Sequence, residues 1–531
     1  MLTADLDLTN LDSPVGLAGG SIFVGESVVT PYAHRLTRAL VVESDDQIAI
    51  ACLERYPGDP SGIEHVRVAG DDGARHVDRV RTHLLDWGLL RIARSSGTVS
   101  YEASQVHVAP VYLCAGPDRV RIDWDCSRLL TARGSAPVDT EMMMAQLGGC
   151  SPYSTRTLVR GMYRSTAGAT LIAHNGRVDT RLGSTTRGAV PQPLAAGTSP
   201  QDMLFDTLTA LLAARDIVPR RLAIEISGGM DSALVALAAA ARFGPDLLSY
   251  GAQFDGTMGD AQRGRRQLLC AHGGYRDIEF PANRFLPFAP ESPRRARFGV
   301  WPQDENYPEI FDAIFGVLAR AGIDTLASGF GGDELYVAYR GEEPDDDSPF
   351  IDNHPFLTAA SRPLVERGAA SETGGIVAKT SWLSTHGRAQ RLLRHGIWPI
   401  YPYINPTLAR YVSSLPWEYR RDRALLRQTL TARLGNPVFE HDYIKENFGE
   451  IAVAGIAGNR DYLRGMVERS HVLAEPLVDR TRILMALDGD IGALPGTTCG
   501  LLFNMLTAAC FFDDPSKAAT SPSQGCASPA D

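Results

Sequence analysis

The sequence predicts a mixed α/β protein in which a β-rich part precedes a parallel sheet covered by helices. Up to about residue 190, short apolar segments alternate with Gly, Pro and Asp turns, a pattern typical of antiparallel sheets. From residue 200 onward, strands alternate with helices, which indicates parallel strands joined by crossover helices. A chain of 531 residues is also too long for a single hydrophobic core, so we expect more than one domain.

The first part is expected to be a sandwich of β-sheets. Its clearest strands are expected at residues 21–24, 40–44, 47–52, 106–114 and 119–124. The stretch 183–200 is rich in Gly, Ser and Pro and is interpreted as a linker. We therefore predict one domain over residues 1–190 and a second over 200–512. The Ser-, Pro- and Ala-rich residues 515–531 are expected to be a disordered tail.

The second part, from residue 200 onward, is expected to alternate between strands and helices. Strands are expected at residues 221–226, 247–254, 275–280 and 324–327. Helices are expected at 232–243, 260–272 and 309–321, and Gly244-Pro245 and Gly273-Gly274 end the first two. From 381 to about 475 the pattern is mainly helical. Such an order of elements predicts a parallel sheet with helices on both faces.

Composition disfavours several classes of protein. The net charge is −10, whereas a nucleic-acid substrate usually requires a basic surface. Eight cysteines without C-x-x-C spacing are interpreted as free thiols, and the acidic first residues do not resemble an export signal, so we expect a cytoplasmic protein. The uncharged stretch 491–512 could span a bilayer by length, but it contains Pro495 and Asn504 and is flanked by acids. We expect a buried helix over 499–511 and no membrane span.

The strongest functional motif is Ser-Gly-Gly-Met-Asp-Ser at residues 227–232, between an expected strand and an Ala-rich helix. Two glycines permit a tight turn that points backbone N–H groups at an anion, and the helix N-terminus adds partial positive charge. Asp231 would repel a phosphate unless it held a cation, so it is interpreted as a Mg²⁺ ligand. The alternative is a simple glycine turn in which Asp231 caps the helix.

A second glycine-rich loop, Ser-Gly-Phe-Gly-Gly-Asp-Glu at residues 328–334, follows another expected strand. Loops that leave the carboxyl ends of neighbouring parallel strands converge on one crevice. The sequence therefore predicts that Asp231 and Asp333 lie around one phosphate-bound metal ion.

These two loops resemble the two signature loops of the asparagine synthetases, and the resemblance covers about residues 200–450. It implies an ATP-pyrophosphatase (PP-loop) domain of the adenine nucleotide α-hydrolase-like type, which cleaves ATP between the α- and β-phosphates, forms an acyl-adenylate and lets an amine attack it. Asp231 and Asp333 would hold Mg²⁺. The residues expected to cradle pyrophosphate are Ser227, Gly228, Gly229 and Ser232. The residues expected to line AMP are Ile226, Ser328 and Gly329.

A third segment extends the resemblance. Residues 442–448, Asp-Tyr-Ile-Lys-Glu-Asn-Phe, are similar to a late region of the family in which a lysine reaches the reacting centre. Lys445 is therefore a predicted catalytic residue that stabilises charge on pyrophosphate and on the tetrahedral intermediate. A solvated loop lysine is the alternative. For Arg423 and Arg427, a phosphate contact and an ion pair on a helix face both remain open.

The amino terminus departs from the glutamine-dependent members of the family, which use a cysteine as residue 2. Leu2 offers no nucleophile, so this part is predicted to be a degenerate Ntn-amidohydrolase-like domain without glutaminase activity. Relatives without that cysteine include the β-lactam synthetases and the lasso-peptide cyclases. In the β-lactam branch a tyrosine of a Tyr-Glu base pair lies just before the metal aspartate. Phe330 stands there and cannot take a proton, which disfavours the β-lactam branch. The Gly-Gly-Asp-Glu form of residues 331–334 resembles the cyclases more closely.

The leading prediction is closure of a macrolactam on a ribosomal lasso-type peptide, with ATP and Mg²⁺, and with a leader-binding protein and a protease as candidate partners. The alternative is a stand-alone ligase that joins a small-molecule carboxylate to ammonia or to a substrate amine. A nucleic-acid-modifying ATP pyrophosphatase would share only the first loop, and an inactive scaffold would not need the predicted catalytic residues. Asp304 and Glu305 could add metal or base function, and the acidic loop 342–347 is a solvated segment or a lid.

Overall fold

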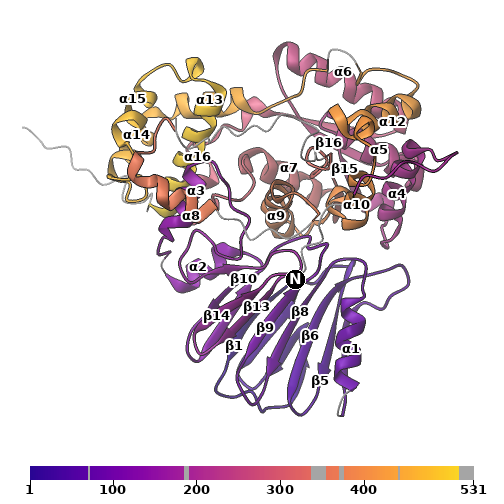
Figure 1. Cartoon of the computed structure of the whole chain (residues 1–531), viewed down its shortest axis with the longest axis vertical. Helices are drawn as coiled ribbons and strands as arrows, with labels where there is room; N and C mark the ends of the chain where they lie inside the picture. Colours follow the sequence, from indigo (N-terminus) through magenta and orange to yellow (C-terminus); the bar gives the residue numbers. More distant parts are fainter. Residues whose placement is uncertain are drawn as a thin grey trace, which may run out of the picture.

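The computed structural model describes residues 1–69, 72–134, 136–183, 190–336, 354–369, 376–440 and 443–513. It is a mixed α/β protein, with β-sheets at one end and helices around a parallel sheet at the other (Figure 1). The predicted α/β class and the β-rich first part are confirmed. The acidic loop 342–347 and the predicted tail 515–531 lie outside the described residues.

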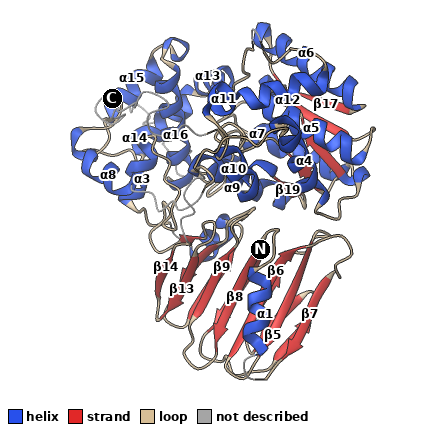
Figure 2. Cartoon of the chain, turned by 45° about the vertical axis from the view of Figure 1, so that its right-hand side comes forward, coloured by secondary structure: helices blue, strands red, loops and turns tan. Residues whose placement is uncertain are grey.

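The β-rich part contains, within the described residues, two seven-stranded sheets, and the strands of the second are labelled in Figure 2. The first is antiparallel, in the order β12 (Tyr163–Arg164), β10 (Tyr112–Ala115), β11 (Arg119–Asp123), β1 (Leu2–Asp7), β4 (Ser27–Pro31), β3 (Ser21–Val24) and β2 (Val15–Ala18). The second is mixed because β5 and β7 are parallel. Its order is β14 (Arg177–Arg181), β13 (Thr170–His174), β9 (Val99–Ala103), β8 (Trp87–Ala93), β6 (Gln47–Glu54), β5 (Thr37–Glu43) and β7 (Gly62–Arg67).

Alternating burial explains how these two sheets pack. In β1, Leu2, Ala4 and Leu6 are buried while the residues between them are partly exposed, as expected for a strand with one face in a core. Leu6 and Ile50 of β6 belong to the same buried cluster although they lie in different sheets. The two sheets therefore share one apolar core.

The second part contains, where the structure describes it, a five-stranded sheet that is parallel throughout. Its order is β17 (Arg276–Pro281), β16 (Leu248–Gln253), β15 (Leu222–Glu225), β18 (Thr325–Ala327) and β19 (Trp398–Ile400). Four of these strands match the predicted ones. β19 lies in a region expected to be mainly helical, and Pro399 in its centre hides the strand pattern. Proline is tolerated there because β19 is at the edge of the sheet.

Helices cover both faces of this sheet, with α4, α5, α6 and α12 on one side and α7 and α9 on the other (Figure 1). The helices of the β-rich part are α1 (Asp72–Arg81), α2 (Cys126–Arg133) and α3 (Thr140–Leu147). Those around the parallel sheet are α4 (Pro200–Ala213), α5 (Met230–Phe243), α6 (Gly256–Gly273), α7 (Pro308–Arg320), α9 (Lys379–Arg394), α10 (Pro406–Ser413), α11 (Trp417–Arg420) and α12 (Ala424–Leu434). The remaining ones are α8 (Arg362–Ala369), α13 (Gly449–Gly458), α14 (Arg460–Arg469), α15 (Arg480–Asp488) and α16 (Gly496–Phe512).

The expected strand at residues 106–114 is largely wrong, because only β10 at its end is a strand. The backbone N–H groups of His107 and Val108 donate instead to the side chains of Ser104 and Asp86, at 2.9 and 3.1 Å. Pro110 has no N–H group to donate. The backbone hydrogen bonds of this segment therefore go to buried side chains rather than to a neighbouring strand.

The apolar stretch near the carboxyl end is a buried helix, as expected. α16 packs in a helical cluster with α13 and α14 and also with α3 of the β-rich part. No helix in the described part of the chain combines the length and the apolarity that crossing a bilayer requires. The seven cysteines among the described residues are free thiols.

Polar contacts join the β-rich part to the amino edge of the parallel sheet. Asp324, directly before β18, accepts hydrogen bonds from Arg35 at 2.9 Å and from Arg221 at 2.9 Å. Glu54 of β6 accepts from Trp398 of β19 at 2.9 Å. The opposite, carboxyl edge of the sheet is the one from which the two glycine-rich loops leave.

Candidate functional site

The first loop turns sharply from β15 into α5. Gly228 has φ +89°, and a Cβ atom there would lie 2.9 Å from Gln262 Cγ, so the position requires glycine. Gly229 occupies the N-cap of α5 and no side chain of the described residues caps this helix. The N–H groups of its first turn consequently lack helical acceptors, and Met230, Asp231 and Ser232 present them at the loop. Such an arrangement is suited to binding an anion.

Hydrogen bonds hold this loop in shape without a ligand. The backbone N–H of Ser227 donates to Ser232 Oγ at 3.2 Å, and the two hydroxyls lie 3.1 Å apart. From α6, Gln262 Nε2 donates to the carbonyl of Ser227 and Arg265 Nε to the carbonyl of Gly228, each at 2.7 Å. The predicted phosphate loop is therefore preorganised by side chains of α6.

The second loop lies directly against the first, and two of its glycines make this possible. A Cβ atom at Gly329 would lie 2.4 Å from Ser232 N. A Cβ atom at Gly332 would lie 2.3 Å from Asp231 Oδ1. Any larger residue at either position would separate the loops. The sequence prediction that the two loops converge agrees with this geometry.

Arg423 joins the two predicted metal ligands. Its Nη1 donates to Asp231 Oδ2 at 2.7 Å and to Asp333 Oδ1 at 2.7 Å. Lys445 Nζ donates to the other oxygen of Asp333, Oδ2, at 2.8 Å. The structure thus brings the three predicted catalytic residues into one charged cluster with Arg423. Arg427 lies outside it and donates to the backbone carbonyl of Phe439 at 2.7 Å.

One oxygen of Asp231 has an unusual environment. Oδ1 is inaccessible to solvent and has no hydrogen-bond partner among the described residues. Burial raises the pKa of Asp231 to about 7, whereas the charge of Arg423 lowers it and that of Asp333 raises it. An unpaired, buried carboxylate oxygen is unfavourable unless it binds a cation. Carboxylate oxygens are ligands that Mg²⁺ prefers, so the donor set of Asp231 and Asp333 fits Mg²⁺.

The protein alone would not complete a metal shell. The described residues contain no group of three or more His, Cys, Asp and Glu side chains that could hold a metal ion. Mg²⁺ in phosphate-transferring sites is usually bound by one or two carboxylates together with substrate phosphates and water. Two aspartates beside a phosphate loop match that pattern.

The residues expected to line AMP lie at the carboxyl edge, below the loops. Ile226 is fully buried, and its N–H donates to the carbonyl of Tyr250 at 2.9 Å. Ser328 is also fully buried, and its Oγ accepts from the N–H of Phe330 at 3.3 Å. Both positions belong to the loop cluster, and their contact with a nucleotide stays a prediction.

Sequence reasoning assigned no role to Glu446 and Arg265. Glu446 accepts a hydrogen bond from Ser227 Oγ at 3.0 Å and pairs with Arg265 at 3.2 Å. The Arg265 guanidinium also lies 4.8 Å from the centre of the Tyr443 ring. These contacts fasten the segment that carries Lys445 to the first loop. In the sequence, Arg265 lies in an expected helix three residues after Gln262, and this position alone does not indicate a role in the site.

Asp304 and Glu305 each form an ion pair with an arginine. Asp304 pairs with Arg391 at 3.1 Å, and Glu305 pairs with Arg388 at 2.6 Å. The Phe330 ring lies 4.0 Å from the Arg388 guanidinium. Phe330 therefore packs against a buried cation, and both acids pair with arginines, although Asp304 Oδ1 has no hydrogen-bond partner among the described residues.

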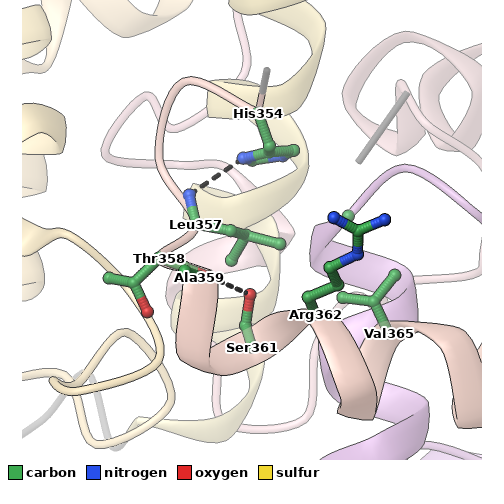
Figure 3. Close-up of a pocket in the computed structure, with 8 residues that line it drawn as sticks. His354, Leu357, Thr358, Ala359, Ser361, Arg362 and Val365 are labelled. Atoms are coloured by element: carbon green, nitrogen blue, oxygen red, sulfur yellow. Dashed lines mark hydrogen bonds between the residues drawn. The ribbon is translucent and has the colours of Figure 1, made fainter. Parts of the chain in front are cut away.

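A separate cavity of about 200 Å³ lies between the end of α3 and α8 (Figure 3). His354 Nδ1 accepts from the N–H of Leu357 at 2.9 Å, and Ser361 Oγ donates to the carbonyl of Thr358 at 2.8 Å. The residues that line it are Gly148, His354, Leu357, Thr358, Ala359, Ser361, Arg362 and Val365. They include no carboxylate or thiol, and both ring nitrogens of the lining histidine, His354, hydrogen-bond to backbone groups.

Comparison with known proteins adds no assignment, because no family model matches the chain and no curated protein matches it. The features of this chain that bear on its function are the geometry of the two glycine-rich loops and their resemblance to the signature loops of the asparagine synthetases.

Proposed function

We propose that this protein is an ATP-dependent amide ligase of the asparagine-synthetase type. It activates a carboxylate as its adenylate, releases pyrophosphate, and joins the acyl group to an amine with release of AMP. The leading substrate is a ribosomal lasso-type peptide that is closed as a macrolactam, and a small-molecule carboxylate with ammonia or a substrate amine is the alternative. The observation that carries the proposal is the cluster of Asp231, Asp333 and Lys445 where the two glycine-rich loops meet.

The finer fold assignment belongs to the same proposal. The two packed sheets of the first part support a degenerate Ntn-amidohydrolase-like sandwich. The five-stranded parallel sheet, with one glycine-rich loop after β15 and one after β18, supports an ATP-pyrophosphatase domain of the PP-loop type. The predicted boundary near residues 190–200 stays a prediction.

Each cluster residue has a role in the proposed reaction. The first-turn N–H groups of α5 and the hydroxyls of Ser227 and Ser232 bind the phosphates that leave as pyrophosphate. Asp231 and Asp333 would hold Mg²⁺, which would neutralise the charge that develops on these phosphates. The substrate carboxylate oxygen bonds to the α-phosphorus as the bond to pyrophosphate breaks. The amine then bonds to the acyl carbon, loses a proton, and AMP leaves.

Composition adds support for Lys445. Only three of the 52 lysine and arginine residues are lysines, at positions 379, 445 and 517. Arginine supplies nearly every other cation, yet a lysine lies beside Asp333. A lysine ammonium is a compact point charge with rotatable donors, which suits charge that moves from pyrophosphate to a tetrahedral intermediate.

The test is substrate-dependent exchange of radiolabelled pyrophosphate into ATP, with AMP release measured in parallel. We expect Asp231→Asn and Asp333→Asn each to lower AMP formation more than tenfold, which is more than about 1.4 kcal/mol of transition-state stabilisation. Their circular dichroism should match the wild type. Asp206→Asn, a change of an exposed aspartate in α4, is the control.

Two results would contradict the proposal. Release of ADP and phosphate instead of AMP and pyrophosphate would exclude adenylation. A variant that retains more than a tenth of the wild-type rate would remove that aspartate from the metal site. Peptides with an Asp or Glu side chain, compared with free aspartate and ammonia, distinguish the leading substrate from its alternative.

A further inference from the structure

Arg423 has a backbone conformation that is unfavourable for most residues. Asp422 (φ 50°, ψ 24°) and Arg423 (φ 56°, ψ 37°) both lie in the left-handed region, directly before α12. L-amino acids other than glycine seldom adopt this conformation, and two in succession are rarer still. Such strain persists only where surrounding contacts over-determine it, and it gathers at binding sites and switches.

The side chain of Arg423 supplies those contacts. A single nitrogen, Nη1, donates to Asp231 of the first loop and to Asp333 of the second, and the side chain is 18% exposed. These are the same two carboxylates that the proposed function assigns to the metal. The guanidinium therefore lies between them, where a cation bridging both loops would be bound.

Arg423 and such a cation would exclude one another. Two positive charges in direct contact repel one another. Arg423 must leave the aspartates before a divalent cation can bridge them, and its guanidinium then needs another anion. A triphosphate on the first loop would provide one, because phosphate oxygens are strong acceptors for arginine.

We infer that Arg423 acts as a resident counterion, which occupies the cation position of the nucleotide-free protein and exchanges its aspartates for phosphate when the metal and the nucleotide bind together. This inference rests on the proposed function. Without nucleotide, a divalent cation competes with Arg423 for Asp231 and Asp333. With nucleotide, that competition is relieved. Arg423 thereby couples metal binding to nucleotide binding, and it is a positioning residue.

The test measures binding rather than turnover. Mn²⁺ is titrated into the full chain and followed by electron paramagnetic resonance, with and without α,β-methylene-ATP, which cannot release pyrophosphate. In the wild type we expect the nucleotide to tighten Mn²⁺ binding by about 5- to 150-fold, the usual range of coupling between sites. In Arg423→Met we expect Mn²⁺ alone to bind about tenfold more tightly than to the wild type, with most of the coupling lost.

Two further variants separate charge from structure. Arg423→Lys keeps a positive charge and should retain part of the coupling. Arg433→Met removes an arginine of α12 that pairs with Asp202, and should leave Mn²⁺ binding unchanged. Circular dichroism of every variant checks that it is folded. If Arg423→Met does not fold, Arg423→Lys still reports the coupling.

Each outcome distinguishes the inference from the proposed function. If the wild type binds Mn²⁺ with the nucleotide but the Arg423 variants show unchanged coupling, the inference is overturned and the proposed metal site remains. Equal Mn²⁺ affinity with and without nucleotide in the wild type also overturns the inference. If the wild type binds no Mn²⁺ even with the nucleotide, the metal site of the proposed function is wrong and the inference falls with it.

Discussion

The two edges of the parallel sheet differ in how completely their polar groups are paired. At the amino edge, Glu54 accepts from Arg215 at 2.5 Å and from Trp398 at 2.9 Å, and Asp324 accepts from two arginines. Toward the carboxyl edge, five buried oxygens lack a hydrogen-bond partner among the described residues. They are Asp231 Oδ1, Gln253 Oε1 and the hydroxyls of Tyr250, Tyr336 and Tyr401.

This difference indicates a division of labour within one sheet. A buried polar group without a partner costs about 1–3 kcal/mol, so a sequence under selection for stability alone would pair or remove it. Unpaired oxygens are found at the edge where the glycine-rich loops lie, which is the edge that would receive a ligand. At the amino edge, the paired carboxylates of Glu54 and Asp324 stabilise the contact between the two parts of the chain.

The largest effect is expected from breaking the paired edge at Glu54. Glu54→Gln removes the anion that pairs with Arg215 while both side chains are buried. Loss of one partner of a buried ion pair costs about 3–5 kcal/mol, because the other charge stays buried without compensation. Urea unfolding should show this loss of the free energy of unfolding. AMP formation per folded molecule should remain at the wild-type level, and a selective loss of activity would contradict the division between the edges.

At the carboxyl edge, a change of Lys445 should have the opposite effect, a loss of activity without a loss of stability. Its side chain is 59% exposed, so Lys445→Ala should change the melting temperature little. If the ammonium stabilises the reacting centre, product formation should fall by about 10²–10³, or about 2.7–4 kcal/mol. Lys379→Ala, a change of an exposed lysine at the start of α9, is the control.

Separate measurements of pyrophosphate exchange and of amide formation then show which step Lys445 assists. Pyrophosphate exchange that survives while amide formation falls assigns Lys445 to the tetrahedral intermediate. A parallel loss of both assigns it to pyrophosphate. An unchanged rate of product formation would remove Lys445 from the site.

The smallest effect is a pH dependence at the contact between the two parts. His107 and His386 are buried there, with His386 Nε2 2.9 Å from the carbonyl of His107, and burial lowers the pKa of His107 to about 3. An unfolded histidine binds a proton near pH 6.5, whereas the folded one stays neutral. The unfolded state therefore binds more protons below pH 6.5, and the free energy of unfolding falls on acidification toward pH 3.

His107→Gln should remove the proton that the unfolded state binds at this position. Between pH 7.5 and 5.5 the wild type should lose about 1.4 kcal/mol more than the variant, measured by urea unfolding at both pH values. His174→Gln, at an exposed position of β13, should behave as the wild type. Equal losses in His107→Gln and the wild type would show that His107 can take a proton in the folded protein.

The sequence predicted what depends on local patterns. The strand, glycine turn and helix around Ser227 to Ser232 can be recognised because glycine and helix signals lie within a few residues, and α5 begins only two residues before the predicted start. The parallel order of β15 to β18 follows from the alternation of strands and helices. Convergence of the two loops follows in turn from that order.

The parts that the sequence left open or predicted wrongly depend on contacts between distant segments. Arg423 and Asp231, which form an ion pair, are 192 residues apart in the sequence. The left-handed backbone at Asp422 and Arg423 could not be predicted either, because neither residue is glycine. The loss of the expected strand at 106–114 depends on Asp86 and Ser104, which accept from its backbone only in the folded chain. No local pattern reports such partners.

The packing of α3 against α16 has a consequence for how the chain is made. Met142 and Leu147 of α3 share an apolar cluster with Leu502 and Leu506 of α16. A ribosome that adds 5–20 residues per second needs roughly 20 to 70 s to travel the ~350 residues between the two helices. α8 also packs on α3 and is synthesised earlier, so it can cover α3 before α16 is made. The part of the α3 face that α16 covers is therefore buried only when the last helix emerges.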